Sequence, residues 1–172
     1  LLDIAVDHLL RLSGAYFAAG AAFVAIPVMF ANLRIVTQAL LEKTILPELT
    51  RAFAQAKGPL VYHHGGNRIV DHLGLCSDLP NVAGFLLDPR DNLSEARDIL
   101  GPGRLMLGNV SGPGLARMLP DKAYASVSAL LADRASDRNF VLASAHADIP
   151  CDTNPDTLLA VRRALEDAGA VA

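Results

Sequence analysis

The sequence predicts an α/β fold built around a parallel sheet, and three features of its 172 residues support this prediction. Short apolar runs recur along the chain, and segments with helical periodicity separate them. Hydrophobic residues make up 52% of the chain, whereas aromatic residues account for only 5% and tryptophan is absent. Strands that are buried on both faces, as in parallel sheets covered by helices, show such continuous apolar runs.

The predicted elements alternate in the order strand then helix, which is typical of βα units. Apolar runs predict strands at residues 23–29, 59–62, 82–87, 104–107 and 140–143. Helical patterns occupy residues 35–56, 68–75, 94–100, 114–132 and 155–168, and a further helix at residues 1–19 precedes the first strand. No linker or low-complexity segment divides residues 1–172, so we expect a single domain with five βα units.

Local signals mark several helix boundaries. Asn92 followed by Glu95 three residues later is typical of a helix N-terminus. Pro155 favours the first turn of the last helix, and Gly101 is a typical helix stop. These residues place the helices that follow the third and fifth strands.

Charge and cysteine content exclude several classes of protein. Fifteen basic and eighteen acidic residues give a net charge of -3 without a Lys/Arg cluster, so we expect no nucleic-acid partner. Cys76 and Cys151 are too few for a disulfide framework, which indicates a reducing compartment and predicts a cytoplasmic protein. Residues 12–33 carry no charge, but Gly20 and Pro27 favour a buried helix and strand over a membrane span.

Polar side chains gather where the predicted strands end. They are His63, His64 and Asn67 after the second strand, Asp88 after the third, Asn109 after the fourth, and Ser144, His146 and Asp148 after the fifth. Ligands of parallel α/β proteins bind at the carboxyl ends of the strands, where loops and helix N-termini converge. The sequence therefore predicts the functional site at this pole, with a small molecule as its ligand.

Two interpretations of the histidines stay open. His63, His64 and His146 could supply imidazole ligands to zinc or a similar metal, provided that Gly65 and Gly66 let the chain leave strand geometry. Alternatively, one or both adjacent histidines form hydrogen bonds with neighbouring backbone or with a substrate carboxylate.

Other combinations of polar residues are weaker candidates. His72 and Cys76 lie one helical turn apart, but packing explains them better than metal binding does. A Ser/His/Asp triad made of Ser144, His146 and Asp148 is disfavoured, because strict alternation along a strand would not bring the three side chains into mutual contact.

An ordered set of short motifs resembles the uroporphyrinogen decarboxylase superfamily. The motifs are Tyr62-His63-His64-Gly65-Gly66-Asn67, Leu86-Leu87-Asp88 leading to Leu93-Ser94-Glu95-Ala96-Arg97, Gly101, Leu107-Gly108-Asn109-Val110, and Ile149-Pro150-Cys151-Asp152-Thr153. The similarity covers residues 19–168 and implies a (β/α)8 fold of the TIM-barrel type, of which this chain carries five C-terminal βα units. The open edges of such a partial barrel are expected to be covered by the missing barrel strands or by a second copy of the chain.

Within that superfamily, the segment around His63 is similar to the zinc motif of methylcobalamin:thiol methyltransferases. The resemblance implies that His63 occupies the zinc-histidine position, whereas Gly65 and Ala147 replace the two cysteine ligands. From their place at the strand ends, we expect catalytic roles for His63, His146 and Asp88, and substrate or cofactor binding by Asn67, Asn109, Ser144 and Asp148. Alternatively, Asp88 and Asn109 tie down loops, as Asp and Asn often do in turns. Zinc and a corrinoid carried on a partner protein are the cofactors that the resemblance suggests.

Three functions remain in competition. The leading one is a corrinoid-dependent methyltransferase-like enzyme that moves a methyl group between a small substrate and a corrinoid protein or thiol. The second is a non-catalytic scaffold that has lost its metal site. The third is a decarboxylase, disfavoured because the late histidine of that branch aligns with Ala147 and because Ile26-Pro27-Val28 replaces an acidic residue. Under either enzymatic hypothesis, we expect His63 and His146 to face the same cavity.

Overall fold

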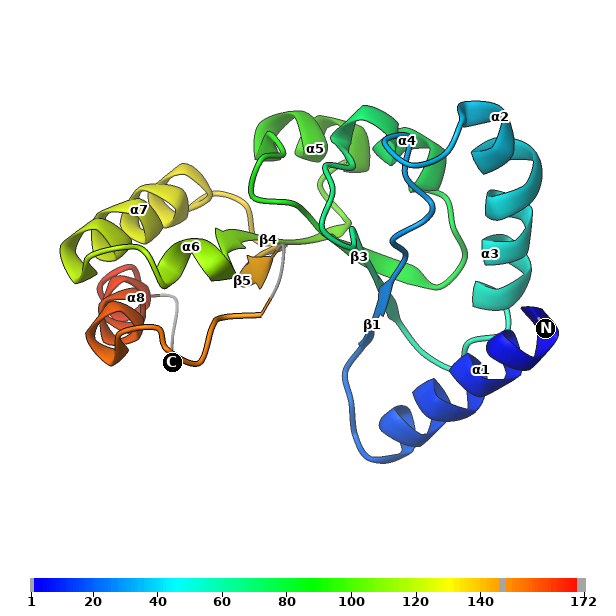
Figure 1. Ribbon diagram of the computed structural model, residues 1–172, viewed down its shortest axis with the longest axis horizontal. Helices are drawn as coiled ribbons and strands as arrows, with labels where there is room; N and C mark the ends of the chain where they lie inside the picture. Colours follow the sequence, from blue (N-terminus) through cyan, green and yellow to red (C-terminus); the bar gives the residue numbers. More distant parts are fainter. Residues whose placement is uncertain (1, 146–147, 170–172) are drawn as a thin grey trace.

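Five parallel strands form one sheet in the computed structural model, which describes residues 2–145 and 148–169. The strands are β1 (Val24–Pro27), β2 (Leu60–His63), β3 (Val82–Leu86), β4 (Leu105–Ser111) and β5 (Phe140–Ala145). They lie side by side in sequence order, β1-β2-β3-β4-β5, and each pair is parallel. The sheet and its flanking helices (Figure 1) confirm the predicted α/β fold of a partial barrel.

Helices precede, connect and follow the strands, as the alternating pattern predicted. They are α1 (Leu2–Ala18), α2 (Gln38–Leu40), α3 (Leu46–Phe53), α4 (Leu73–Cys76), α5 (Leu93–Leu100), α6 (Gly112–Leu115), α7 (Pro120–Asp133) and α8 (Pro155–Asp167). A π-helical turn (Leu41–Ile45) joins α2 to α3, and a 3-10 turn (Val70–His72) precedes α4. Figure 1 shows α7 and α8 packed together on the β5 side of the sheet, with α1 and α3 on the β1 side.

Several predicted boundaries differ from the structure. The helix predicted at 35–56 begins only at Gln38, and the helix predicted at 114–132 is two helices, because Pro120 begins α7 at its first turn. The helix predicted at 68–75 is only a 3-10 turn followed by the four-residue α4. Strand β4 extends to Ser111 and β5 to Ala145, so Asn109 and Ser144 belong to strands rather than to the loops after them.

The predicted helix caps are present. The side chain of Asn92 accepts hydrogen bonds from the backbone N–H groups of Ser94 and Glu95, at 2.9 and 3.2 Å. Asn154 caps α8, and Pro155 occupies its first turn. Gly101 ends α5 at a φ of 70°, a left-handed conformation that favours glycine.

The two faces of the sheet contribute to two hydrophobic clusters, because side chains alternate along each strand. Leu60, Tyr62, Phe85 and Met106 pack in the larger cluster together with Phe53 of α3. Val61, Leu86, Leu107 and Ala145 form the smaller cluster on the other face. Burial of both faces explains why the strands appear in the sequence as nearly continuous apolar runs.

The sheet is open, with β1 and β5 as its edge strands. Apolar side chains remain exposed close to β1 in the sequence, among them Ile4, Tyr16 and Phe23, and Val141 is exposed on β5. Within the part of the chain that the structure describes, no helix is both long and apolar enough to cross a bilayer.

Candidate functional site

The site is built on the glycine turn that follows β2. Gly65 and Gly66 both have positive φ angles, 68° and 95°, which glycine adopts without a steric penalty. The turn directs two backbone N–H groups back onto the preceding histidines. The amide of Gly65 donates to Nδ1 of His63 at 2.9 Å, and the amide of Gly66 donates to Nδ1 of His64 at 2.9 Å.

The same turn stacks the two imidazole rings. Their centroids lie 4.8 Å apart with an interplanar angle of 11°. His64 is fully buried, whereas His63 at the end of β2 is partly exposed. Adjacent residues of a strand point to opposite faces, so the stacking occurs because the chain leaves strand geometry after His63, as the glycines predicted.

The hydrogen bond from Gly65 indicates the tautomer of His63. A nitrogen that accepts an amide proton carries the lone pair, so the ring proton of a neutral His63 resides on Nε2. Burial lowers the pKa of His63 below its usual value, which favours the neutral form. His63 is therefore a neutral side chain with an Nε2–H group to donate.

A cavity of about 500 Å³ brings three of the predicted site residues together. His63, Ser144 and Asp148 supply its polar lining, and Pro27, Met29 and Ala145 supply its apolar lining. The cavity lies at the carboxyl ends of β1, β2 and β5, the pole where ligands of parallel α/β folds bind. His146, which we expected to face the same cavity, lies outside the described residues.

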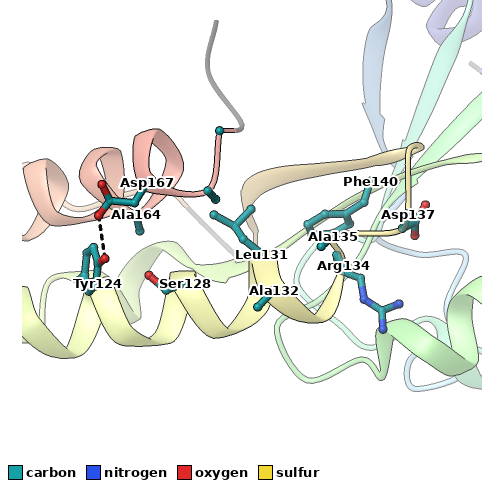
Figure 2. Close-up of a pocket in the computed structure, with 12 residues that line it drawn as sticks. Tyr124, Ser128, Leu131, Ala132, Arg134, Ala135, Asp137, Phe140, Ala164 and Asp167 are labelled. Carbon is teal, nitrogen blue, oxygen red and sulfur yellow. Dashed lines mark hydrogen bonds between the residues drawn. The ribbon is translucent and has the colours of Figure 1, made fainter.

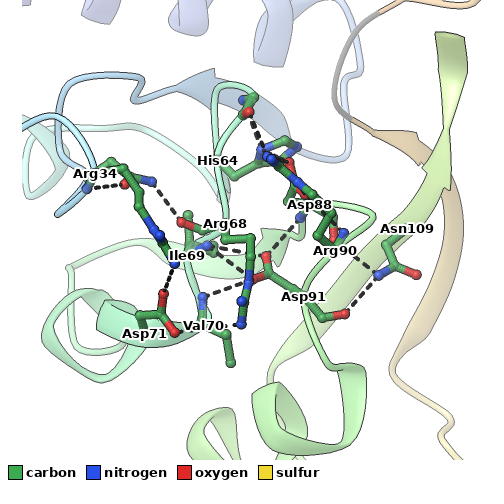
Figure 3. Close-up of polar contacts among 12 residues, drawn as sticks. Arg34, His64, Arg68, Ile69, Val70, Asp71, Asp88, Arg90, Asp91 and Asn109 are labelled. Atoms are coloured by element: carbon green, nitrogen blue, oxygen red, sulfur yellow. Dashed lines mark hydrogen bonds and ion pairs between the residues drawn. The ribbon is translucent and has the colours of Figure 1, made fainter.

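Asp88, another predicted catalytic residue, is held by a neighbouring arginine. Its carboxylate is fully buried and accepts hydrogen bonds from Nε and Nη2 of Arg90, at 2.6 and 2.9 Å (Figure 3). Burial alone would raise the pKa of Asp88, but the hydrogen bonds from Arg90 outweigh it and hold that pKa below its usual range. Arg90 also donates to the carbonyl of Gly66 at 3.1 Å, which links the glycine turn to the loop after β3.

His64 and Asp88 approach each other within this network. Nδ1 of His64 lies 3.6 Å from Oδ2 of Asp88, a distance too long for a hydrogen bond. The same nitrogen already accepts the amide proton of Gly66. Asp88 itself is not among the described residues that line the cavity.

Asp91 is a residue of this network that sequence analysis missed. Its buried carboxylate accepts hydrogen bonds from the backbone N–H groups of Ile69, Val70 and Asp88, at 3.2, 3.2 and 3.0 Å (Figure 3). It thereby joins the segment before α4 to the loop after β3. The sequence signal was the repeated aspartate in Asp88-Pro89-Arg90-Asp91, but only the fold shows that the second one binds amides about twenty residues earlier.

The two predicted asparagines have different surroundings. Nδ2 of Asn109 donates to the carbonyls of Asp88 and Asp91, at 3.1 and 3.2 Å, so it fixes the loop after β3. Asn67 is partly exposed next to the glycine turn and makes no side-chain hydrogen bond with any described residue. Neither asparagine is among the described residues that line the cavity, so their proposed roles in substrate binding stay predictions.

The two cysteines and His72 do not take part in this site. Both cysteines are free thiols, and Cys76 is buried against the hydroxyl of Tyr62, with its Sγ 4.0 Å away. His72 is buried as well, and burial lowers its pKa. The packing interpretation of His72 and Cys76 agrees with these positions.

The described residues do not fit zinc. A histidine that binds zinc through Nε2 donates its Nδ1–H to an acceptor, but Nδ1 of both His63 and His64 faces an amide donor. At Gly65, which the resemblance aligns with a cysteine ligand, an added Cβ would lie 2.4 Å from Cγ and 2.7 Å from Cα of Met29. No group of three or more His, Cys, Asp or Glu side chains within residues 2–145 and 148–169 could hold a metal ion. Ala147, like His146, is outside those residues.

A second cavity lies at the opposite pole of the sheet. It has a volume of about 580 Å³ and lies between α7 and α8 (Figure 2), where Tyr124 donates to Asp167 at 2.7 Å. Phe140, the first residue of β5, lines it. This cavity is larger than the one lined by His63. It lies at the amino end of β5, however, and in barrel folds the residues at that pole contribute to stability rather than to catalysis.

Comparisons with known proteins support the same fold. A methyltransferase from Methanosarcina mazei superposes with a TM-score of 0.80 at 20% sequence identity, over 96% of this chain and 48% of the methyltransferase. The chain thus spans about half the length of that enzyme, and at this identity the likeness concerns the fold alone. No curated protein matches the sequence. The family model for uroporphyrinogen decarboxylase (URO-D) matches residues 1–168, so the chain belongs to the uroporphyrinogen decarboxylase family.

Proposed function

We propose that this chain is part of a methyl-transferring enzyme that moves a methyl group between a small substrate and a corrinoid carried on a partner protein. The observation that carries the proposal is the position of His63. It lies at the end of β2, where the resemblance implies the family's zinc-histidine position, and it lines a cavity together with Ser144 and Asp148. The likeness to a methyltransferase supports the proposal at the level of the fold.

The proposed enzyme acts without zinc. His63 binds the substrate through its Nε2–H, because the amide of Gly65 occupies the other ring nitrogen. Met29 fills the space where a cysteine at position 65 would stand, so the site lacks that thiolate. A substrate thiol would therefore not be activated by a metal here, which favours a different nucleophile or leaving group.

The sheet has two open edges, at β1 and β5. A closed (β/α)8 barrel would need about three more βα units beside the five present, whereas a second copy of this chain would bring five. We propose that about three complementary βα units, rather than a second copy, cover β1 and β5. A stable homodimer in light scattering of the purified chain would contradict this assignment.

Methyl transfer is tested with the purified full-length protein and methylcobalamin. In this reaction the Co–CH3 bond breaks, its electron pair stays on cobalt as cob(I)alamin, and the methyl group bonds to a lone pair of the acceptor. Loss of the methylcobalamin absorbance, measured with a panel of small amines, thiols and carboxylates, reports turnover. We expect His63→Ala to slow turnover by about a hundredfold, and His8→Ala, at an exposed position of α1, to leave it unchanged. A rate equal to that without protein would favour the non-catalytic scaffold.

A further inference from the structure

The polar groups of the cavity differ in what they can bind. His63 presents an N–H donor, because its Nδ1 is occupied by the amide of Gly65. Asp148 presents a carboxylate, which is an acceptor. Ser144 contributes a hydroxyl group, which can act in either way. The lining thus contains one position suited to a substrate oxygen anion and another suited to a cation.

The charge of Asp148 is not balanced within the described chain. Its side chain is exposed, and it forms no ion pair or hydrogen bond with any other residue in 2–145 or 148–169. The nearby buried carboxylates differ, since Asp88 binds Arg90 and Asp91 binds backbone amides. Asp148 is therefore a carboxylate of the cavity lining that no described residue neutralises.

Among the described residues, the other side chains that line the cavity are apolar. Met29 is 48% exposed and lines the cavity together with Pro27 and Ala145. An exposed thioether packs well against methyl groups, because sulfur is polarizable and the side chain adapts its shape. Methyl groups carried by a cation next to Asp148 would lie against these apolar side chains.

From this arrangement we infer that the cavity takes a small zwitterion, a quaternary N-methylated ammonium carboxylate, with its ammonium group at Asp148 and its carboxylate at the Nε2–H of His63. The inference rests on the proposed function and names the substrate class of the same site. As a methyl donor, such a substrate would pass CH3 to cob(I)alamin. The electron pair of the broken C–N bond would stay on nitrogen, leaving a neutral tertiary amine and methylcob(III)alamin.

Binding is measured by calorimetry with three probes of similar size and without any corrinoid. Trimethylglycine carries both charges, 3,3-dimethylbutanoate has the same shape but lacks the positive charge, and choline lacks the carboxylate. We expect the full-length protein to bind trimethylglycine at least about tenfold more tightly than either of the other two. Equal affinity for trimethylglycine and dimethylbutanoate would overturn the inference.

Variants assign the two ends of the ligand. Asp148→Asn should abolish the preference for trimethylglycine over 3,3-dimethylbutanoate. Asp152→Asn, at another exposed position of the same loop, should retain that preference. His63→Phe should abolish the preference for trimethylglycine over choline. His63→Gln, which keeps an N–H donor, should retain part of that preference. An unchanged preference in Asp148→Asn or in a folded His63→Phe would contradict the assignment.

The two proposals can fail separately. If trimethylglycine is preferred but no methyl transfer occurs, either from methylcobalamin to the acceptor panel or from trimethylglycine to cob(I)alamin, the substrate class stands and the methyltransferase assignment fails. If methyl transfer occurs with other substrates and the zwitterion has no advantage in binding, the function stands and this inference fails.

Discussion

Replacing Asp91 with alanine removes one carboxylate that holds two segments of the candidate site together. The side chain has no solvent exposure, and its oxygens accept three backbone N–H groups, from Ile69, Val70 and Asp88. In Asp91→Ala these amides lose their acceptor. The segment before α4 then no longer has this connection to the loop after β3.

The size of the effect follows from these contacts. A buried amide that loses its partner costs about 1–3 kcal/mol, and charged acceptors lie at the upper end of that range. Three amides are affected, but water entering the space left by Asp91 would satisfy some of them. We therefore expect the free energy of unfolding to fall by about 3–5 kcal/mol.

Urea denaturation followed by circular dichroism measures this loss. With a slope of about 2 kcal/mol per molar urea, the midpoint should fall by roughly 1.5–2.5 M. The matched control is Asp98→Ala, at an exposed position of α5, which should change stability by less than about 0.5 kcal/mol. Equal midpoints for Asp91→Ala and Asp98→Ala would refute the role assigned to Asp91.

Three further predictions concern the same region. Gly65→Cys should lower the free energy of unfolding by about 2 kcal/mol or more and should bind no zinc, because the added side chain is strained at positive φ and meets a neighbouring backbone. Gly103→Ala, where the space is open, is its control, and zinc bound at one equivalent would contradict the prediction. Asn109→Ala should cost about 1–2 kcal/mol in urea denaturation through its two lost hydrogen bonds, and an unchanged midpoint would show that the loop does not need them. Below about pH 6.5 the unfolded chain binds more protons than the folded chain, because burial lowers the pKa of His63 and His72 when folded. The urea midpoint should therefore fall as the pH decreases from about 6.5, and a midpoint that rises would contradict this.

The fold was predictable because its determinants are local. Each strand is a short apolar run, and Asn92 and Gly101 are boundary signals that act on their immediate neighbours. The split between α6 and α7 was missed because apolar periodicity continues across it, although Pro120 was the available signal. The extension of β4 and β5 was missed because pairing with a neighbouring strand, rather than apolar character, keeps their last residues extended.

The site was predictable only in part, because it combines local and distant contacts. The pairing of His63 with His64 follows from the glycines next to them. In contrast, the contact of Met29 with Gly65 and the binding of distant amides by Asp91 depend on how β1, β2 and β3 lie side by side. No periodicity or spacing in the sequence records these contacts.

The tautomer of His63 tests the central claim most directly, because the metal-free donor role depends on it. Long-range ¹H–¹⁵N correlation spectra of the full-length protein with ¹⁵N-labelled histidine distinguish a protonated from an unprotonated ring nitrogen, and His63→Gln identifies the signals of His63. At about pH 7 we expect a neutral ring with the proton on Nε2 and an unprotonated Nδ1. A proton on Nδ1, with Nε2 bound to a metal or unprotonated, would contradict the account.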